Sequence, residues 1–102
     1  MIRLELSAFV ETDLDAIAAF IAEDNPRRAV TFIQDIRGKF GDIQRTPLLY
    51  QLRPDIGDQA RMASVGNYAI LFRVREAAVR IERVVYGGRD LPSVLDIRDE
   101  TS

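Results

Sequence analysis

The amino-acid sequence predicts an α+β domain with the element order β-α-α-β-β-β, in which a helical hairpin packs on a small, mostly antiparallel sheet. Three observations predict this class. Residues 2–7 alternate apolar and charged side chains, as a half-buried strand does. Residues 13–43 carry apolar side chains at helical spacing, with one interruption. Residues 60–86 return to strand periodicity on both sides of a two-residue turn.

The first helix is predicted over residues 13–23. Thr12 precedes Asp13 and Asp15, which places a capping hydroxyl and two acids where the first turn of a helix has unpaired N–H groups. The apolar residues of this segment form one stripe, made of Leu14, Ile17, Ala18 and Ile21.

The second helix is predicted to begin at Asn25-Pro26, because asparagine caps well and proline fits the first helical position. Its apolar face is expected to pack antiparallel on the first helix. That face comprises Ala29, Phe32, Ile33, Ile36, Phe40 and Ile43. Gly38 and Gly41 disfavour a helix, so we expect a frayed last turn before Pro47.

Residues 47–59 contain the prolines and glycine of a loop, and the second strand is expected to begin near Ala60. Gly66-Asn67 predicts a tight hairpin turn into a third strand at Tyr68. That strand alternates Tyr68, Ile70, Phe72 and Val74 with Ala69, Leu71, Arg73 and Arg75.

The fourth strand is predicted from Val79 to Tyr86. Its apolar residues do not share a single alternation; they are Val79, Ile81, Val84 and Val85. A bulge or a strand buried on both faces would explain this pattern.

A chain of 102 residues with 47% hydrophobic content is expected to form one domain over residues 1–95, followed by an acidic tail over residues 96–102. The net charge of −2 argues against general binding to nucleic acids. Cysteine and histidine are both missing, which excludes disulfides, thiolate or imidazole zinc sites and histidine-dependent triads. The sequence has neither a long apolar span nor a secretory signal, so we expect a soluble cytoplasmic protein without a cofactor.

Positive charge is concentrated in residues 61–89, where six arginines face only two glutamates. Because this stretch is predicted to form strands, an anionic partner is expected to meet the sheet. The candidate target-binding patch is Arg61, Arg73, Arg83, Tyr86 and Arg89. Two acidic pairs, Asp13/Asp15 and Asp55/Asp58, are assigned to a helix start and a loop rather than to a metal site.

The same patch contains residue types that suit phosphate chemistry without a metal ion or histidine. Guanidinium groups stabilise a pentavalent phosphorane, and tyrosine is able to donate a proton. Arg83, Tyr86 and Arg89 are therefore the catalytic candidates if the protein is a ribonuclease. The alternative is that the arginines are ordinary solvent-facing positions of the sheet and the tyrosines are aromatics at the edge of the core.

The chain resembles the RelE/ParE superfamily of bacterial toxins over nearly its whole length. The residues that carry the resemblance are Asp13-Leu14-Asp15-Ala16-Ile17, Phe20-Ile21-Ala22, Asn25-Pro26, Phe32, Pro47-Leu48-Leu49, Val65-Gly66, Tyr68, Arg73-Val74 and Tyr86-Gly87-Gly88-Arg89-Asp90-Leu91. Members that are ribonucleases carry an arginine after the third-strand tyrosine and a tyrosine near the C-terminus, where this chain has Ala69 and Leu95. Their lysine-rich second strand is also missing, since Lys39 is the only lysine. The resemblance is therefore closest to the ParE branch.

Resemblance to the ParE branch implies a RelE/ParE toxin-like fold and a type II toxin that inhibits DNA gyrase by binding rather than by catalysis. It also implies neutralisation by a ParD-like antitoxin, which supplies the DNA-binding part, so this chain is not expected to bind DNA sequence-specifically. An antitoxin segment that folds on binding would dock on apolar positions, for which Phe9, Phe20 and Leu49 are the candidates unless they belong to the core. Two alternatives are a RelE-like ribosome-dependent mRNA endonuclease and a non-toxic remnant that only binds antitoxin.

Overall fold

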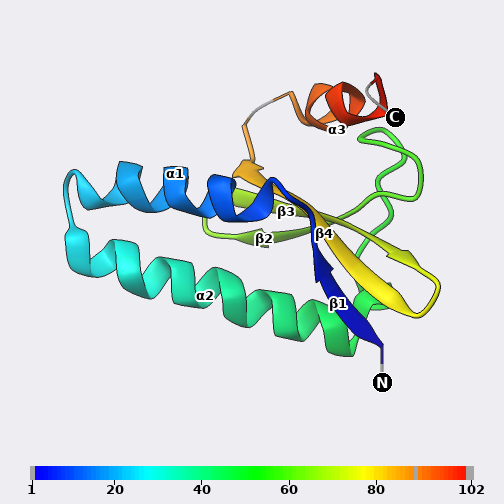
Figure 1. Cartoon of the computed structure of the whole chain (residues 1–102), viewed down its shortest axis with the longest axis horizontal. Coiled ribbons are helices and arrows are strands. Elements are labelled where there is room, and N and C mark those ends of the chain that lie inside the picture. Colours follow the sequence, from blue (N-terminus) through cyan, green and yellow to red (C-terminus); the bar gives the residue numbers. More distant parts are fainter. Residues whose placement is uncertain (1, 89, 101–102) are drawn as a thin grey trace.

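The computed structural model describes residues 2–88 and 90–100, and its elements follow the predicted order with one helix added at the end (Figure 1). The elements are β1 (Arg3–Leu6), α1 (Val10–Ala22), α2 (Pro26–Arg45), the short 3₁₀ turn η1 (Pro47–Leu49), β2 (Arg61–Val65), β3 (Tyr68–Arg75), β4 (Ala78–Tyr86) and α3 (Leu91–Glu100). Within the described residues, no helix combines the length and the apolar character needed to cross a membrane.

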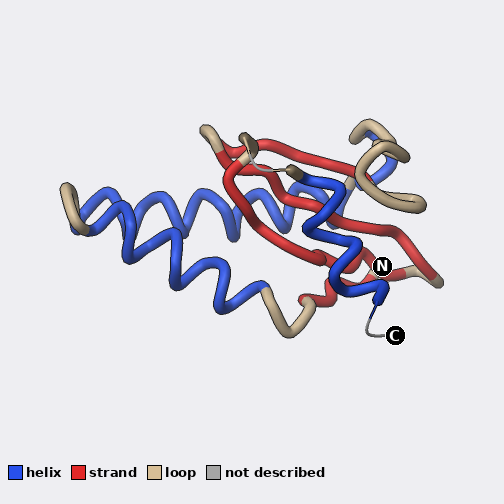
Figure 2. The backbone as a smooth tube through the Cα atoms, turned by 90° about the horizontal axis from the view of Figure 1, so that it is seen from above, coloured by secondary structure: helices blue, strands red, loops and turns tan. Residues whose placement is uncertain are grey.

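The four strands form one sheet in the order β1-β4-β3-β2. The β1 strand runs parallel to β4, pairing Arg3 with Ala78 and Leu6 with Ile81, and the other neighbours are antiparallel. This arrangement confirms the predicted mixed, mostly antiparallel sheet. The α1–α2 hairpin lies on one face and projects well beyond the ends of the strands (Figure 2).

The main core lies between this hairpin and the sheet, and it confirms the two predicted helical stripes. Its buried members are Val10, Leu14, Ile17, Phe32, Ile36, Phe40, Ile43, Ala63, Ile70, Phe72, Val79, Ile81 and Val84. Because the apolar positions of β3 alternate with period two, its remaining side chains point to the opposite face of the sheet.

That opposite face is also buried, because the helix α3 covers it. Leu91, Val94 and Leu95 pack with Ala69, Leu71, Val85, Ile56 and Ala60 in a second apolar cluster. The sequence analysis missed this helix, although its apolar residues follow helical spacing and Asp90 precedes a proline in the first turn. Residues 96–100, expected to belong to an acidic tail, continue α3, and residues 101–102 lie outside the described residues.

The helix α1 begins at Val10, so the prediction that Thr12 caps its start is wrong. The residue before the helix, Phe9, makes no side-chain cap. Instead, the Ser7 hydroxyl accepts a hydrogen bond from the Phe9 N–H at 3.2 Å and donates to the Glu82 carbonyl at 2.5 Å. The start of α1 is therefore fixed by a tertiary contact to β4, which the local sequence does not reveal.

The predicted start of α2 is confirmed, since the Asn25 side chain accepts from the Arg28 N–H at 3.1 Å and Pro26 is the first helical residue. The expected fraying at Gly38 and Gly41 is wrong, because the helix continues to Arg45. Phe40 and Ile43 are buried in the main core, and their packing holds the last turns in place.

Gly38 offers a test of this interpretation. A Cβ atom at this position would meet nothing within 4 Å, so Gly38→Ala removes backbone freedom from the unfolded chain without a clash. We expect the free energy of unfolding to rise by about 1 kcal/mol in urea titrations. The control is Gly66→Ala, where φ is +55° and the new Cβ would lie 3.3 Å from the Phe32 ring. That variant is expected to lose stability, and a destabilised Gly38→Ala would contradict the argument.

The bulge, one of the two explanations offered for the pattern of β4, is present at Glu82. Leu71 pairs with Arg83 whereas the next residue, Phe72, pairs with Ile81, so Glu82 is the extra residue of β4. A one-residue insertion moves the following side chains to the other face of a strand. The bulge therefore explains why the apolar residues of β4 do not follow one alternation. It also directs the Glu82 side chain into the interior of the protein.

Candidate functional site

The predicted arginine patch does not form one exposed surface, and Arg73 is the clearest exception. Arg73 is only 2% exposed. Its Nη1 lies 3.3 Å from Glu82 Oε2, and its Nε donates to the Asp58 carbonyl at 2.7 Å. The expectation that Arg73 faces solvent is wrong, because the loop at residues 57–58 and the bulged glutamate enclose its guanidinium.

Arg83 is paired with Asp13 of the first helix. Its Nε and Nη2 donate to the two oxygens of the Asp13 carboxylate, each at 2.9 Å, and Asp13 Oδ2 also accepts from the Val84 N–H at 3.0 Å. The carboxylate raises the pKa of Arg83 above its ordinary value. The strand β1 pairs with β4 only as far as Leu6, which lies opposite Ile81. Beyond that point Asp13 supplies a hydrogen-bond acceptor to the β4 backbone in place of a strand carbonyl. Arg83 is therefore a structural cation whose charge is already balanced.

Arg61, the other arginine of the patch within the described residues, is also engaged, and so is Arg80, which the patch did not include. Arg61 is half-buried and donates through Nη1 to the Tyr50 carbonyl at 2.5 Å. The Nε of Arg80 lies 3.5 Å from Glu82 Oε1. Arg89, the fourth arginine of the predicted patch, lies outside the described residues. Of the six arginines counted along this stretch, Arg73, Arg80 and Arg83 thus contact carboxylates of the fold.

An apolar groove lies where the projecting hairpin meets the end of the sheet. It has a volume of about 740 Å³ and is lined by Phe20, Ile21, Arg28, Phe32, Gly66, Asn67, Tyr68 and Tyr86. We call it the aromatic groove. Tyr68 stands edge-on to Tyr86 at 6.0 Å between ring centroids and is tilted against Phe32 at 5.6 Å. The groove exists because α1 and α2 extend past the strands while the β2–β3 turn closes one side.

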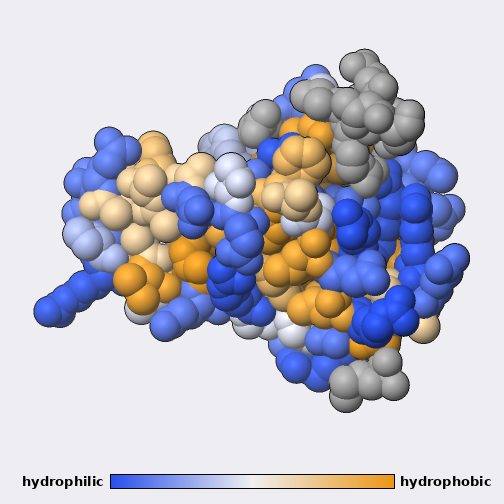
Figure 3. All heavy atoms as spheres, in the orientation of Figure 1, coloured by the Kyte–Doolittle hydropathy of each residue, from blue (hydrophilic) through white to orange (hydrophobic). Residues whose placement is uncertain are grey.

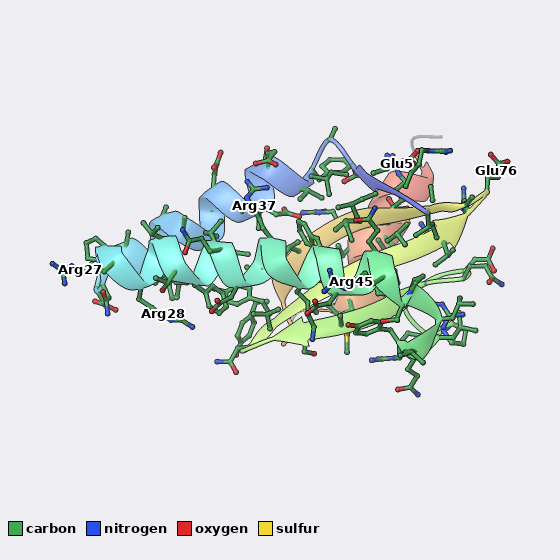
Figure 4. All side chains as sticks on the ribbon, turned by 90° about the horizontal axis from the view of Figure 1, so that it is seen from below. Glu5, Arg27, Arg28, Arg37, Arg45 and Glu76 are labelled. Atoms are coloured by element: carbon green, nitrogen blue, oxygen red, sulfur yellow. The ribbon has the colours of Figure 1, made fainter. Side chains whose placement is uncertain are left out.

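The Arg28 side chain borders the aromatic groove. The Arg28 guanidinium lies 5.0 Å from the centre of the Phe32 ring, a cation–π distance, and Figure 4 shows Arg28 on the side of α2 away from Arg37. Arg28 also donates to Asp35 and Thr31. The groove therefore combines exposed aromatic surface with a positively charged rim, which suits a partner segment with apolar anchors and acidic neighbours.

The three predicted antitoxin contacts are all exposed, so the alternative that they belong to the core is wrong. Phe9, Phe20 and Leu49 are 44%, 67% and 82% exposed. Only Phe20 lines the aromatic groove. Phe9 precedes α1 and lies under the Arg83 guanidinium, at 5.0 Å, whereas Leu49 lies in η1, beyond the far end of α2. The three residues do not form a single contiguous site.

The aromatic groove joins residues that the sequence analysis had assigned to two different roles. Phe20 was expected to contact an antitoxin and Tyr86, which is 54% exposed, was expected to contact the target. Arg28, Phe32 and Tyr68 were not predicted as site residues. A sequence signal existed for Arg28 and Phe32, since they are one turn apart at the start of α2, but only the fold places them beside β3.

The candidate catalytic set is poorly arranged for phosphate chemistry in the part of it that the structure describes. The Arg83 donors that would stabilise a phosphorane bind Asp13. Leu95, where the resemblance to ribonucleases implies a tyrosine, is a residue of α3 that is buried against the sheet and 1% exposed. General acid catalysis needs a proton donor within reach of the leaving group, and a buried leucine offers none. The arrangement favours binding over catalysis.

Comparisons with known proteins agree with this fold. The family model described as "ParE toxin of type II toxin-antitoxin system, parDE" matches residues 4–91. A solved chain from the chromosomal ParDE TA system of P. aeruginosa is similar with a TM-score of 0.73 and 24% sequence identity, covering 84% of this chain and 96% of that chain. No curated protein sequence matches.

Proposed function

The chain belongs to the ParE toxin family of type II toxin-antitoxin systems, and we propose that it inhibits DNA gyrase by binding and is neutralised by a ParD-like antitoxin. Because DNA gyrase and the antitoxin are cytoplasmic, the proposed site of action is the cytoplasm. The observation that supports the proposal most strongly is the match of the family model to residues 4–91. This span contains all the residues that line the aromatic groove.

The hydrogen bonds and burial of the arginines favour inhibition by binding over mRNA cleavage. A ribonuclease of this kind needs guanidinium groups that are free to meet a phosphate in the transition state. Arg83 is held by two hydrogen bonds to Asp13, and Arg73 is buried beside Glu82. An exposed aromatic groove, in contrast, is a surface type that binds protein segments.

The aromatic groove is proposed to serve both partners. Tyr86 and Phe20 both line the aromatic groove. An antitoxin segment anchored at Phe20 would therefore cover Tyr86 and prevent the target from binding there. Phe9 and Leu49 are proposed as additional antitoxin contacts along α1 and at η1, which requires an antitoxin segment that wraps around the hairpin. Arg61 and Arg89 stay proposed as further target contacts, although Arg61 is level with Ile81 in the sheet rather than with Tyr86.

The direct test is supercoiling of relaxed plasmid by gyrase, with the purified chain added alone and then with the neighbouring antitoxin. Inhibition that the antitoxin relieves is the expected result, and Tyr86→Ala is expected to weaken inhibition because Tyr86 is exposed and carries little of the core. Unimpeded supercoiling by a folded chain that binds antitoxin would reject the gyrase target. Mapped mRNA cuts would then identify a ribonuclease, and normal growth on induction without antitoxin would identify a non-toxic remnant.

Antitoxin binding supplies a second prediction. Phe20→Ala is expected to weaken the complex by about 1–2 kcal/mol, roughly 5- to 30-fold in Kd, because a large exposed aromatic side chain is a typical anchor. Isothermal titration calorimetry measures the change. Val30→Ala is the matched control, since Val30 is equally apolar and 60% exposed on the same hairpin but does not line the aromatic groove. Equal losses for the two variants would contradict the proposed place of the antitoxin.

A further inference from the structure

A positively charged surface lies at the end of the sheet opposite the aromatic groove. Three arginines surround the buried Ala78 near the β3–β4 turn, and we call them the arginine face: Arg3, Arg75 and Arg80. Figure 3 shows hydrophilic side chains gathered at the right of the view, where Figure 1 places this turn. Because β3 has eight residues, the arginine face and Tyr68 are about 24 Å apart along the strand.

The register of the strands places the three arginines on one face of the sheet. Arg3 of β1 and Arg75 of β3 both pair with Ala78 of β4, and Arg80 is two residues further along β4. Residues paired across strands point to the same face, and so do residues two apart along one strand. Neighbouring strands are about 5 Å apart, so the Cα atoms of Arg3 and Arg75 lie about 10 Å apart with the small Ala78 side chain between them. A group that binds between these two arginines is therefore able to approach the sheet closely.

The carboxylates near the arginine face do not balance its charge. Arg75 is exposed, and no carboxylate of residues 2–88 or 90–95 pairs with it. Arg80, whose side chain is 41% exposed, lies 3.5 Å from Glu82, but this carboxylate also pairs with a buried arginine. Arg3 lies 3.5 Å from Glu5 in an exposed pair, which contributes little in water. Arg75 and Arg80 thus leave positive charge that a bound anion would neutralise.

The surroundings of the arginine face favour a nucleic-acid backbone over a protein segment. Protein interfaces are anchored by large apolar or aromatic side chains. Among the described residues of these three strands that are large, apolar and exposed, Leu6 points to the opposite face and Tyr86 lies at the other end of the sheet. Guanidinium groups bind phosphates through paired hydrogen bonds and need no apolar neighbour. Glu76 extends from the tip of the turn, beyond the ends of the strands (Figure 4).

From this geometry and charge we infer that the arginine face contacts the phosphate backbone of duplex DNA while the chain is bound to gyrase. The contact rests on the proposed gyrase target, because gyrase is the partner that carries DNA. The chain has a net charge of −2, so its contact with free DNA is weak. Gyrase bound near Tyr86 would hold its DNA at a high effective concentration, which makes a weak contact sufficient. The toxin then binds gyrase with DNA more tightly than gyrase alone.

Titration of a short fluorescent DNA duplex, followed by anisotropy, tests the contact without gyrase. With three phosphate contacts, the Kd for DNA is expected to rise about 40-fold between about 20 and 80 mM salt. Arg75→Gln removes one contact, so the rise is expected to shrink to about 12-fold. Arg27→Gln is the matched control, because Arg27 is also exposed and lies at the far end of the hairpin (Figure 4). It changes the net charge equally and is expected to keep the 40-fold rise of the unmodified chain.

The affinity of the chain for gyrase, measured with and without bound duplex DNA, tests the contact in the complex. DNA is expected to lower the Kd for gyrase about tenfold. Arg75→Gln is expected to remove most of this gain, whereas Arg27→Gln is expected to keep it. Both arginines are exposed, so the fold is expected to persist in each variant, which circular dichroism checks.

Equal salt dependence of DNA binding in Arg75→Gln and Arg27→Gln would overturn the inference, and so would a gyrase affinity that DNA does not change. The gyrase proposal survives both outcomes if the unmodified chain still inhibits supercoiling. A chain that does not bind gyrase at all would reject that proposal and the inference with it. Weaker antitoxin binding by Arg75→Gln, with DNA binding unchanged, would assign the arginine face to an acidic antitoxin segment and likewise overturn the inference.

Discussion

Replacing Glu82 by alanine is expected to lower the free energy of unfolding by about 3–5 kcal/mol, the largest loss that we expect from a polar substitution in this chain. The Glu82 and Arg73 side chains are each 3% exposed and lie 3.3 Å apart. Removing the carboxylate leaves a buried guanidinium that still donates to the neutral Asp58 carbonyl but has lost its counter-charge, and an unpaired buried charge is costly. Urea unfolding followed by circular dichroism measures the loss.

The control for Glu82→Ala is the double variant Arg73→Met with Glu82→Leu. It removes both charges and keeps apolar volume under α3, so it is expected to be more stable than Glu82→Ala alone. A double variant that is less stable than the single one would mean that the pair stabilises the fold by more than its desolvation costs. A loss below about 1 kcal/mol in Glu82→Ala would contradict the burial of the pair.

Replacing Asp13 by alanine is expected to cost about 3 kcal/mol. One carboxylate accepts two hydrogen bonds from Arg83 and one from the Val84 N–H, and its side chain is only 10% exposed. The substitution therefore leaves both a partly buried cation and a backbone donor without their acceptor. Thermal and urea unfolding of the purified variant measure the cost.

Two further variants separate these contributions. Asp13→Asn keeps an acceptor for the Val84 N–H but removes the charge, so its stability is expected to fall between wild type and Asp13→Ala. Asp15→Asn is the matched control, because Asp15 lies on the same helix but is exposed, and it is expected to change stability by less than about 0.5 kcal/mol. Equal effects at the two positions would contradict the special role of Asp13.

The sequence predicted those parts of the fold that depend on local signals. Asn25-Pro26 marked the start of α2 because capping and the proline ring act within one turn of helix. The broken alternation of β4 predicted the bulge, since each side chain of a strand reports which face it occupies. The fold class followed from these periodicities alone.

The parts that sequence reasoning missed depend on contacts between distant residues. Arg73 was expected to face solvent because charged residues in strands usually do, but α3, the loop before β2 and the inward Glu82 enclose that face of the sheet. Asp13 was predicted as an acid of the first helical turn, where it does lie, but its pairing with a residue 70 positions later was not foreseen. The aromatic groove was missed for the same reason, because its lining comes from four different elements.

The parallel pairing of β1 with β4 has a consequence for the order in which the chain folds during translation. Ser7 bonds to Glu82, which is 75 residues further along, so the first strand has no neighbour in the sheet until most of the chain has been synthesised. At bacterial rates this delay is about 4–15 s. The helical hairpin, made of local contacts, is expected to form first on the ribosome, with Ser7 and Asp13 still lacking their partners. The surface that joins hairpin and sheet, which includes the aromatic groove, is thus expected to form only at the end of synthesis.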